Sequence, residues 1–217
     1  MAKLSGPLMS LGARGSIAKT IVTSKWRGIA YARQHVIPAN PKTTAQMFVR
    51  NMFAALREMW KVAPTVLQAP WDAFASGRQF LGMNKWVGEN VRVLKGEADL
   101  NNLIMSPGAR GGLAPDSFSA ATGAASGEIT FDFAVPASPP GWTLTAAVAV
   151  AIADQAPDAI FQGVIGFEEV TMAPWDGIIS GLVPATDYQV GGWLVWTKPD
   201  GKLAYSVSIV DQATSDA

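Results

Sequence analysis

Apolar side chains in the first half of the chain recur at three- and four-residue spacing, which is the period of an amphipathic helix. The longest stripe predicts a helix over residues 44–62 and consists of Phe48, Met52, Ala55, Leu56, Met59 and Trp60. Thr43 and Gln46 stand at its start with the spacing of a capping box, in which the threonine hydroxyl accepts from the third backbone N–H. Pro64 is expected to end this helix, because proline cannot continue the hydrogen-bonded ladder.

Two shorter apolar stripes predict further helical segments downstream of Pro64. The first covers residues 70–80, where Pro70 suits the first helical turn. The second covers residues 84–94. The aromatic residues in these stripes are interpreted as core, because buried aromatic side chains mostly pack against other apolar groups.

Upstream of the helices, two short segments alternate between apolar and polar positions, as half-buried strands do. They cover residues 17–23 and 29–37, and Trp26-Arg27-Gly28 between them predicts a hairpin turn. Residues 1–20 are expected to form an extended arm, since they contain four residues that interrupt regular structure, namely Gly6, Pro7, Gly12 and Gly15.

The second half of the chain alternates with a period of two and is broken by turn residues at short intervals, which is typical of a β-sandwich. The expected strands cover residues 128–135, 143–152, 160–168, 176–180, 187–196 and 203–209. Small and turn-forming residues over 106–126 predict a boundary between the halves. The predicted fold is therefore α+β in two parts: an extended arm, a β-hairpin and helices over residues 1–112, then an all-β sandwich over residues 113–217.

Charge divides the chain in the same way, although the net charge is zero. Residues 1–117 contain 15 Lys and Arg against 6 Asp and Glu, whereas residues 118–217 contain 2 against 11. Such asymmetry concerns binding partners rather than the fold. We expect the basic part to bind a negatively charged partner, and the residues expected to make this contact are Arg14, Lys19, Lys25, Trp26, Arg27, Arg33 and Lys42.

Composition excludes several kinds of chemistry. The chain has no cysteine and a single histidine, His35, so disulfides, cysteine-based metal sites and two-histidine mechanisms are ruled out. Residues 12–20 contain the residue types of a phosphate loop but not its spacing, because Ala18 stands where a glycine should precede Lys19.

Two carboxylate pairs, Glu168-Glu169 and Asp154/Asp158, are interpreted as solvated groups rather than as an acid–base pair, which needs a cleft that separates the two pKa values. We therefore expect no enzymatic activity, no cofactor and no metal ion.

The sequence predicts a soluble protein with a sizeable core, since 49% of its residues are hydrophobic and 16% are charged. No secretion signal is visible, and the longest apolar run, residues 144–153, is shorter than the roughly 20 residues of a membrane-spanning helix. We expect synthesis in the cytoplasm and no membrane association.

Residues 181–188, Gly-Leu-Val-Pro-Ala-Thr-Asp-Tyr, resemble the E–F corner of fibronectin type III domains, which typically reads Gly-Leu-x-Pro-x-Thr-x-Tyr. The resemblance extends over roughly residues 115–212 and includes Pro199-Asp-Gly as the F–G turn. It implies an immunoglobulin-like sandwich in which Leu182 plugs the base of the core and the Tyr188 hydroxyl bonds to nearby backbone. Phe133 departs from the pattern, because the family usually has tryptophan there.

Residues 10–60 resemble the N-terminal modules of uncharacterised proteins from tailed phages and prophages. The matching motifs are Gly15-Ser-Ile-Ala-Lys-Thr-Ile-Val, Trp26-Arg-Gly, Tyr31-Ala-Arg and Asn40-Pro-Lys-Thr-x-Ala-Gln-x-x-x-Arg50. The resemblance implies an origin in a tailed bacteriophage and a place in the virion, and it implies no catalytic residue.

The first functional hypothesis is a virion structural protein that decorates the capsid, with its basic N-terminal part bound to the major coat lattice. A position in the neck, tail or baseplate is the alternative within the same class. A nucleic-acid-binding module is an alternative of another class, since aromatic and basic residues interleave at Lys25-Trp26-Arg27. A surface adhesin or carbohydrate binder is a further hypothesis, and the opposite charges of the two halves also predict head-to-tail self-association.

Overall fold

The computed structural model describes residues 2–3, 15–37, 39–161 and 165–216. The chain forms two compact units, Met1–Lys42 and Thr43–Ala217, which we call unit 1 and unit 2. The structure therefore divides the chain between Lys42 and Thr43, whereas the sequence predicted a boundary at residues 112/113.

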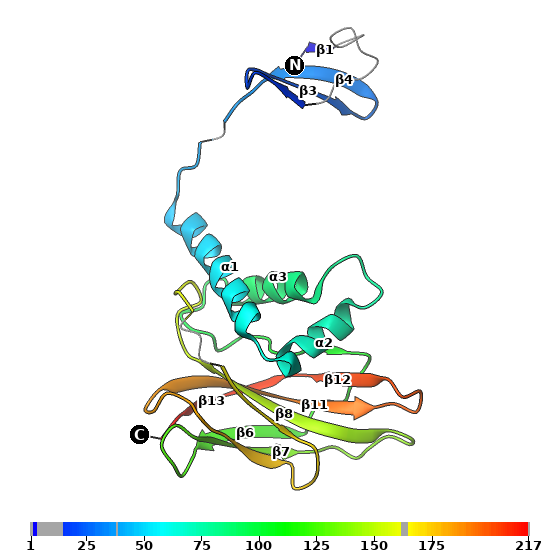
Figure 1. The fold of residues 1–217 in the computed structure, drawn as a ribbon, viewed down its shortest axis with the longest axis vertical. Coiled ribbons are helices and arrows are strands. Elements are labelled where there is room, and N and C mark those ends of the chain that lie inside the picture. The colour runs from blue at the N-terminus through cyan, green and yellow to red at the C-terminus, as the bar shows by residue number, and fades with distance from the viewer. Residues whose placement is uncertain (1, 4–14, 38, 162–164, 217) are drawn as a thin grey trace. The chain divides into compact units, whose positions relative to one another are not determined.

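Unit 1 contains a four-stranded antiparallel sheet in the order β1-β4-β3-β2 (Figure 1). Its strands are β1 (Ala2–Lys3), β2 (Gly15–Ile17), β3 (Ile21–Trp26) and β4 (Ile29–Gln34). The hairpin of β3 and β4 confirms the turn predicted at Trp26-Arg27-Gly28. The extended arm over residues 1–20 is corrected in part, because Gly15–Ile17 pairs with β3 as a strand, and the remainder of that prediction, residues 4–14, lies outside the described residues.

The first helix of unit 2, α1 (Thr44–Val62), has the predicted bounds. The Thr43 hydroxyl accepts a hydrogen bond from the Gln46 backbone N–H at 3.4 Å, which confirms the cap. The buried side of α1 consists of Met52, Ala55, Leu56 and Met59, all members of the predicted stripe.

The second helix begins earlier than predicted. Helix α2 (Thr65–Ala75) starts directly after Pro64, so that proline both ends α1 and precedes the next helix. Pro70 lies inside α2 rather than in its first turn, and residues 76–80 are not helical. Helix α3 (Gly82–Leu94) lies close to the predicted position.

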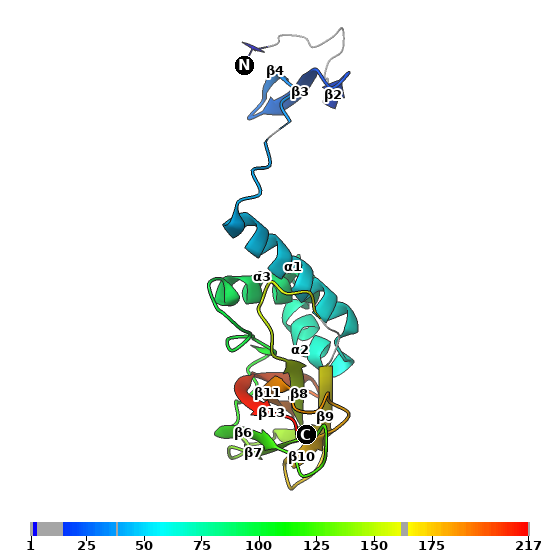
Figure 2. The ribbon, with the colours of Figure 1, turned by 90° about the vertical axis from the view of Figure 1, so that its left-hand side faces the viewer.

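Two antiparallel sheets form the rest of unit 2 (Figures 1 and 2). The three-stranded sheet has the order β10-β7-β6 and consists of β6 (Ser117–Thr122), β7 (Ile129–Ala134) and β10 (Asp176–Ile179). The six-stranded sheet has the order β5-β12-β11-β8-β9, with β13 also paired to β11, and consists of β5 (Pro107–Ala109), β8 (Thr143–Ala153), β9 (Ile165–Val170), β11 (Asp187–Thr197), β12 (Leu203–Val207) and β13 (Ile209–Thr214).

The three helices cover the outer side of the six-stranded sheet, and the three-stranded sheet covers its other side (Figure 1). Strand β8 shows this arrangement directly, because its successive residues point alternately into two different hydrophobic cores. The helix-side core, which the sheet shares with α1–α3, contains Ala146, Val148, Val150 and Ile152. The inter-sheet core, which lies between the two sheets, contains Ala147, Ala149 and Ala151. The helices and the sandwich are therefore one unit.

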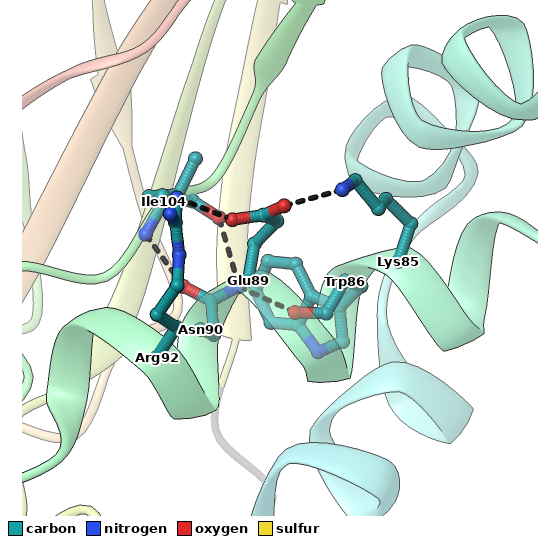
Figure 3. A network of polar contacts seen from close by, with 6 residues as sticks. All are labelled: Lys85, Trp86, Glu89, Asn90, Arg92 and Ile104. Atoms are coloured by element: carbon teal, nitrogen blue, oxygen red, sulfur yellow. Dashed lines mark hydrogen bonds and ion pairs between the residues drawn. The ribbon is translucent and has the colours of Figure 1, made fainter.

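A buried asparagine fastens α3 to the segment that leads into the sandwich (Figure 3). The Asn90 side chain accepts a hydrogen bond from the Ile104 N–H at 2.7 Å and donates to the carbonyls of Ile104, at 3.2 Å, and Trp86, at 3.1 Å. Beside it, Glu89 pairs with Lys85 and, at 2.7 Å, with Arg92. The hydrogen bond from Lys85 lowers the pKa of the Glu89 carboxyl below its usual value.

The tyrosine corner predicted from residues 181–188 is present. The Tyr188 hydroxyl accepts a hydrogen bond from the Val183 N–H at 2.9 Å, and burial raises the pKa of Tyr188. Leu182 is buried in the inter-sheet core, as predicted. Two antiparallel sheets with this corner make the second half a fibronectin type III-like sandwich.

One buried tryptophan gives a stability prediction. Trp193 and Trp71 are both fully buried in the helix-side core, but only Trp71 has a partner for its indole N–H, the Met105 carbonyl at 2.8 Å. Since an unpaired buried donor costs about 1–3 kcal/mol, we expect Trp193→Phe to lower the free energy of unfolding by less than Trp71→Phe, with a difference of about 1 kcal/mol. Urea unfolding followed by far-ultraviolet circular dichroism measures both variants, and equal losses would contradict this expectation.

Candidate functional site

The sheet of unit 1 exposes apolar side chains to solvent on both of its faces. Among the described residues of this unit, only Thr23 is buried, and none belongs to either core of unit 2. Trp26 is 64% exposed, and three isoleucines of the strands are also exposed, namely Ile17, Ile21 and Ile29. A small sheet without a core is marginally stable in water. Exposed apolar surface of this kind is typical of sites that bind another molecule.

The strand register assigns these residues to two faces. Ile21 lies opposite Ile17 on β2 and opposite Gln34 on β4. Because side chains alternate along a strand, Thr23 and Lys25 lie on the same face of β3 as Ile21. Trp26 lies opposite Ile29 on the other face, which Arg33 shares further along β4.

Two tight turns close the hairpins of unit 1, and each has positive backbone φ angles at consecutive residues. Arg27 (φ 47°) and Gly28 (φ 85°) connect β3 to β4, and Ala18 (φ 47°) and Lys19 (φ 53°) follow β2. Two consecutive residues with positive φ are the signature of a type I′ turn, which matches the twist of a hairpin. The turns therefore project Lys19 and Arg27 from opposite ends of the sheet.

The structure does not gather the predicted contact residues into one cluster. Trp26 and Arg27 are brought together, since the guanidinium carbon of Arg27 lies 4.9 Å from the centroid of the Trp26 ring, within cation–π range. The other described members are exposed but dispersed. One lies in the opposite turn, one on each face of the sheet, and one at the end of unit 1, namely Lys19, Lys25, Arg33 and Lys42. Arg14 lies outside the described residues.

The carboxylate pairs considered in the sequence are separated. Glu168 and Glu169 are consecutive residues of β9 and so point to opposite sides of the strand. Asp154 accepts hydrogen bonds from the Leu100 N–H, at 3.3 Å, and from the Gln212 amide, at 3.4 Å. Asp158 lies instead beside a hollow of about 260 Å³ next to α1.

A second surface was missed by the sequence analysis. The outer side of the three-stranded sheet carries two cross-strand rows of three residues: Ser119, Asp132 and Asp176 in one, and Ala121, Thr130 and Ile178 in the other. These residues line a hollow of about 400 Å³. The period-two alternation of Thr130-Phe131-Asp132-Phe133 was the available signal, since it places Asp132 on the side away from the core. We call this surface the acidic face.

Within the part of the chain that the structure describes, no group of three or more His, Cys, Asp or Glu side chains is arranged to hold a metal ion. None of the described helices combines the length and apolar character needed to span a membrane.

No family model matches the chain, and the search of curated proteins found no match. Three similar solved structures are β-sandwiches. A computationally redesigned β-sandwich protein has 11% identity and a TM-score of 0.34 over 48% of this chain and 91% of its own. The fibronectin type III domain of human contactin 1 has 15% identity and a TM-score of 0.34 over 49% of this chain and 79% of its own. The FN5 domain of Drosophila Lar has 16% identity and a TM-score of 0.33 over 48% of this chain and 95% of its own.

Proposed function

We propose that this chain is a structural protein of a tailed-phage virion that decorates the capsid, with unit 1 bound to the coat lattice. The observation that carries the proposal is the surface of unit 1. Its described residues form a sheet without a core and with exposed apolar side chains. Residues 1–42 contain seven Lys and Arg and no Asp or Glu. A basic sheet of this kind gains apolar burial and charge pairing only when it binds an acidic protein surface.

The assignment to a tailed phage depends on the sequence motifs of residues 10–60. The proposal also gives a position within the virion, namely the capsid. Copy number separates the capsid from the neck, tail or baseplate. A decoration protein is expected at hundreds of copies per particle, and a neck or tail protein at far fewer. Gel densitometry of purified virions against the major coat protein measures this number.

The dispersion of the basic side chains favours a protein lattice over a nucleic-acid strand as the partner. Lys25 and Arg33 lie on opposite faces of the sheet, and Lys19 and Arg27 lie at opposite ends. A strand-binding protein instead tracks the phosphate backbone with a continuous basic groove.

The proposal predicts that capsids assembled without this chain lose resistance to heat. Full-length protein added back should restore the melting temperature of the capsids. A variant with Lys25→Glu and Arg33→Glu should restore it less, because both changes reverse charges on unit 1. Arg57→Glu with Lys95→Glu, two exposed charge reversals on unit 2, is the matched control and should restore it fully. Capsids that melt at the same temperature with and without the chain would refute the proposal.

A further inference from the structure

The acidic face carries negative charge that the surrounding residues leave uncompensated. Asp132 and Asp176 lie directly opposite each other on β7 and β10, an arrangement that disfavours pairing of the strands. Both are exposed, and no Lys or Arg among the described residues forms an ion pair with either of them. Beside them, Ile178 is 46% exposed. The face therefore offers an anionic row next to an apolar row.

The turn between β3 and β4 of unit 1 offers the complementary pair of groups. Trp26 is a large exposed apolar side chain, and Arg27 next to it has a guanidinium that carboxylates bind with two parallel hydrogen bonds. A hollow of about 400 Å³ falls in the size range that accepts such side chains. Trp and Arg are also the residue types that most often dominate the energy of an interface.

We propose that the Trp26–Arg27 turn of one copy docks on the acidic face of a second copy. Trp26 packs on the row of Ala121, Thr130 and Ile178, and Arg27 pairs with Asp132 and Asp176. The contact joins two different surfaces, so it builds a ring or a chain of copies rather than a two-fold dimer. The inference rests on the proposed function only for its setting, in which neighbouring copies lie side by side on one lattice. It leaves the face with Lys25, and the Arg33 end of the other face, for the coat.

A second copy is favoured over the same chain as the source of the turn. Unit 2 joins unit 1 through Thr43 at the start of α1, which belongs to the helix layer. The acidic face lies on the opposite side of the six-stranded sheet (Figures 1 and 2). Docking of the turn on the acidic face of its own chain would leave the unaltered chain monomeric, so the association state distinguishes the two arrangements.

Sedimentation velocity of the purified full-length chain tests the proposal. We expect association at low ionic strength and dissociation in high salt, because salt screens the charge pairing. Arg27→Asp and the double variant Asp132→Lys/Asp176→Lys should each be monomeric. Trp26→Ala should weaken association by about tenfold or more. Arg33→Asp makes the same charge change at the other end of the hairpin and is the matched control, which should associate like the unaltered chain.

Mixing the two monomeric variants gives the sharpest outcome. Arg27→Asp retains an intact acidic face, and Asp132→Lys/Asp176→Lys retains an intact turn, so the mixture should associate although each variant alone is monomeric. Far-ultraviolet circular dichroism checks that each variant is folded, and Asp132→Asn/Asp176→Asn replaces the lysine variant if that one is unfolded. A wild-type chain that stays monomeric at low salt, or a mixture that stays monomeric, would overturn the inference. Capsid stabilisation is measured separately, so either idea can fail while the other stands.

Discussion

Replacing Gly192 by alanine should destabilise unit 2 by about 3 kcal/mol, the upper end of the usual cost of overfilling a packed core. Gly192 lies in the middle of β11, between the two sheets. An added Cβ would overlap the ring of Phe118 and lie 2.7 Å from Cε1 of Phe133. The rings of Phe118 and Phe133 pack on each other with centroids 4.8 Å apart, so neither can move away without disturbing the other.

Gly88→Ala is the matched control for this experiment, since it adds the same atom elsewhere in unit 2. Gly88 lies in α3 and is exposed. Apart from the adjacent backbone of α3, no atom lies within 4 Å of the position of an added Cβ. Alanine there should stabilise the helix by about 0.5–1 kcal/mol. Urea denaturation measures both variants. If Gly192→Ala unfolds at the same urea concentration as the unaltered chain, the two sheets do not pack as closely as described.

The neighbouring Gly191 shows why β11 contains two consecutive glycines. Its missing side chain would point toward the helices, where Met105 occupies the space, with Cγ 2.9 Å from the position of an added Cβ. Consecutive residues of a strand face opposite sides. One glycine therefore admits Met105 from the helix side, and the other admits the phenylalanines of the three-stranded sheet. Strand β11 is therefore packed closely on both of its faces, whereas a two-sheet sandwich alone would require close packing on only one face.

Local signals predicted individual elements well. The bounds of α1 followed from an apolar stripe, a Thr43 cap and a terminating proline, all of which act within a few residues. Tyr188 and Leu182 likewise occupy a motif whose contacts lie close in sequence. The start of α2 was missed because Pro64 was interpreted only as an end signal, whereas the residue after a proline can begin a new helix.

Packing between distant segments could not be predicted in the same way. The apolar run of β8 predicted a strand, but not that helices cover one of its sides. Strand β6 was interpreted as part of a boundary because it consists mainly of Ser, Ala and Thr, yet Phe118 and Ala120 alternate toward the core. The expected boundary at residues 112/113 had the same origin. Small and turn-forming residues are concentrated around it, yet residues of this segment, such as Leu113 and Phe118, belong to or pack against the inter-sheet core.

In the candidate site, too, features set by adjacent residues were predicted, and features set by strand pairing were not. The sequence predicted the hairpin and its turn, and the Trp26–Arg27 pair followed from their adjacency. It did not predict the strand register, which distributes Lys25 and Arg33 to opposite faces. Nor did it reveal the acidic face, because Asp132 and Asp176 are 44 residues apart and meet only through the pairing of β7 with β10.

Val150→Asp should unfold unit 2 or release its helix layer, with a loss of about 4 kcal/mol or more, because it buries an unpaired charge. Val150 is fully buried in the helix-side core. In a sandwich without a helix layer, this position would face solvent and accept an aspartate. Val207→Asp is the matched control, since Val207 belongs to the same sheet but is 54% exposed, and it should cost far less.

The pH dependence of Val150→Asp separates charge burial from a purely steric effect. Burial raises the pKa of a carboxyl, so the folded variant binds a proton that the unfolded chain releases above about pH 4. The free energy of unfolding of the variant, relative to the unaltered chain, should therefore fall as pH rises from about 4 and recover in part below it. Thermal melts at pH 4 and pH 7 measure this difference. Equal melting temperatures for Val150→Asp and Val207→Asp would mean that the helices are not an integral layer, and the outer side of the six-stranded sheet would then be a solvent-facing surface.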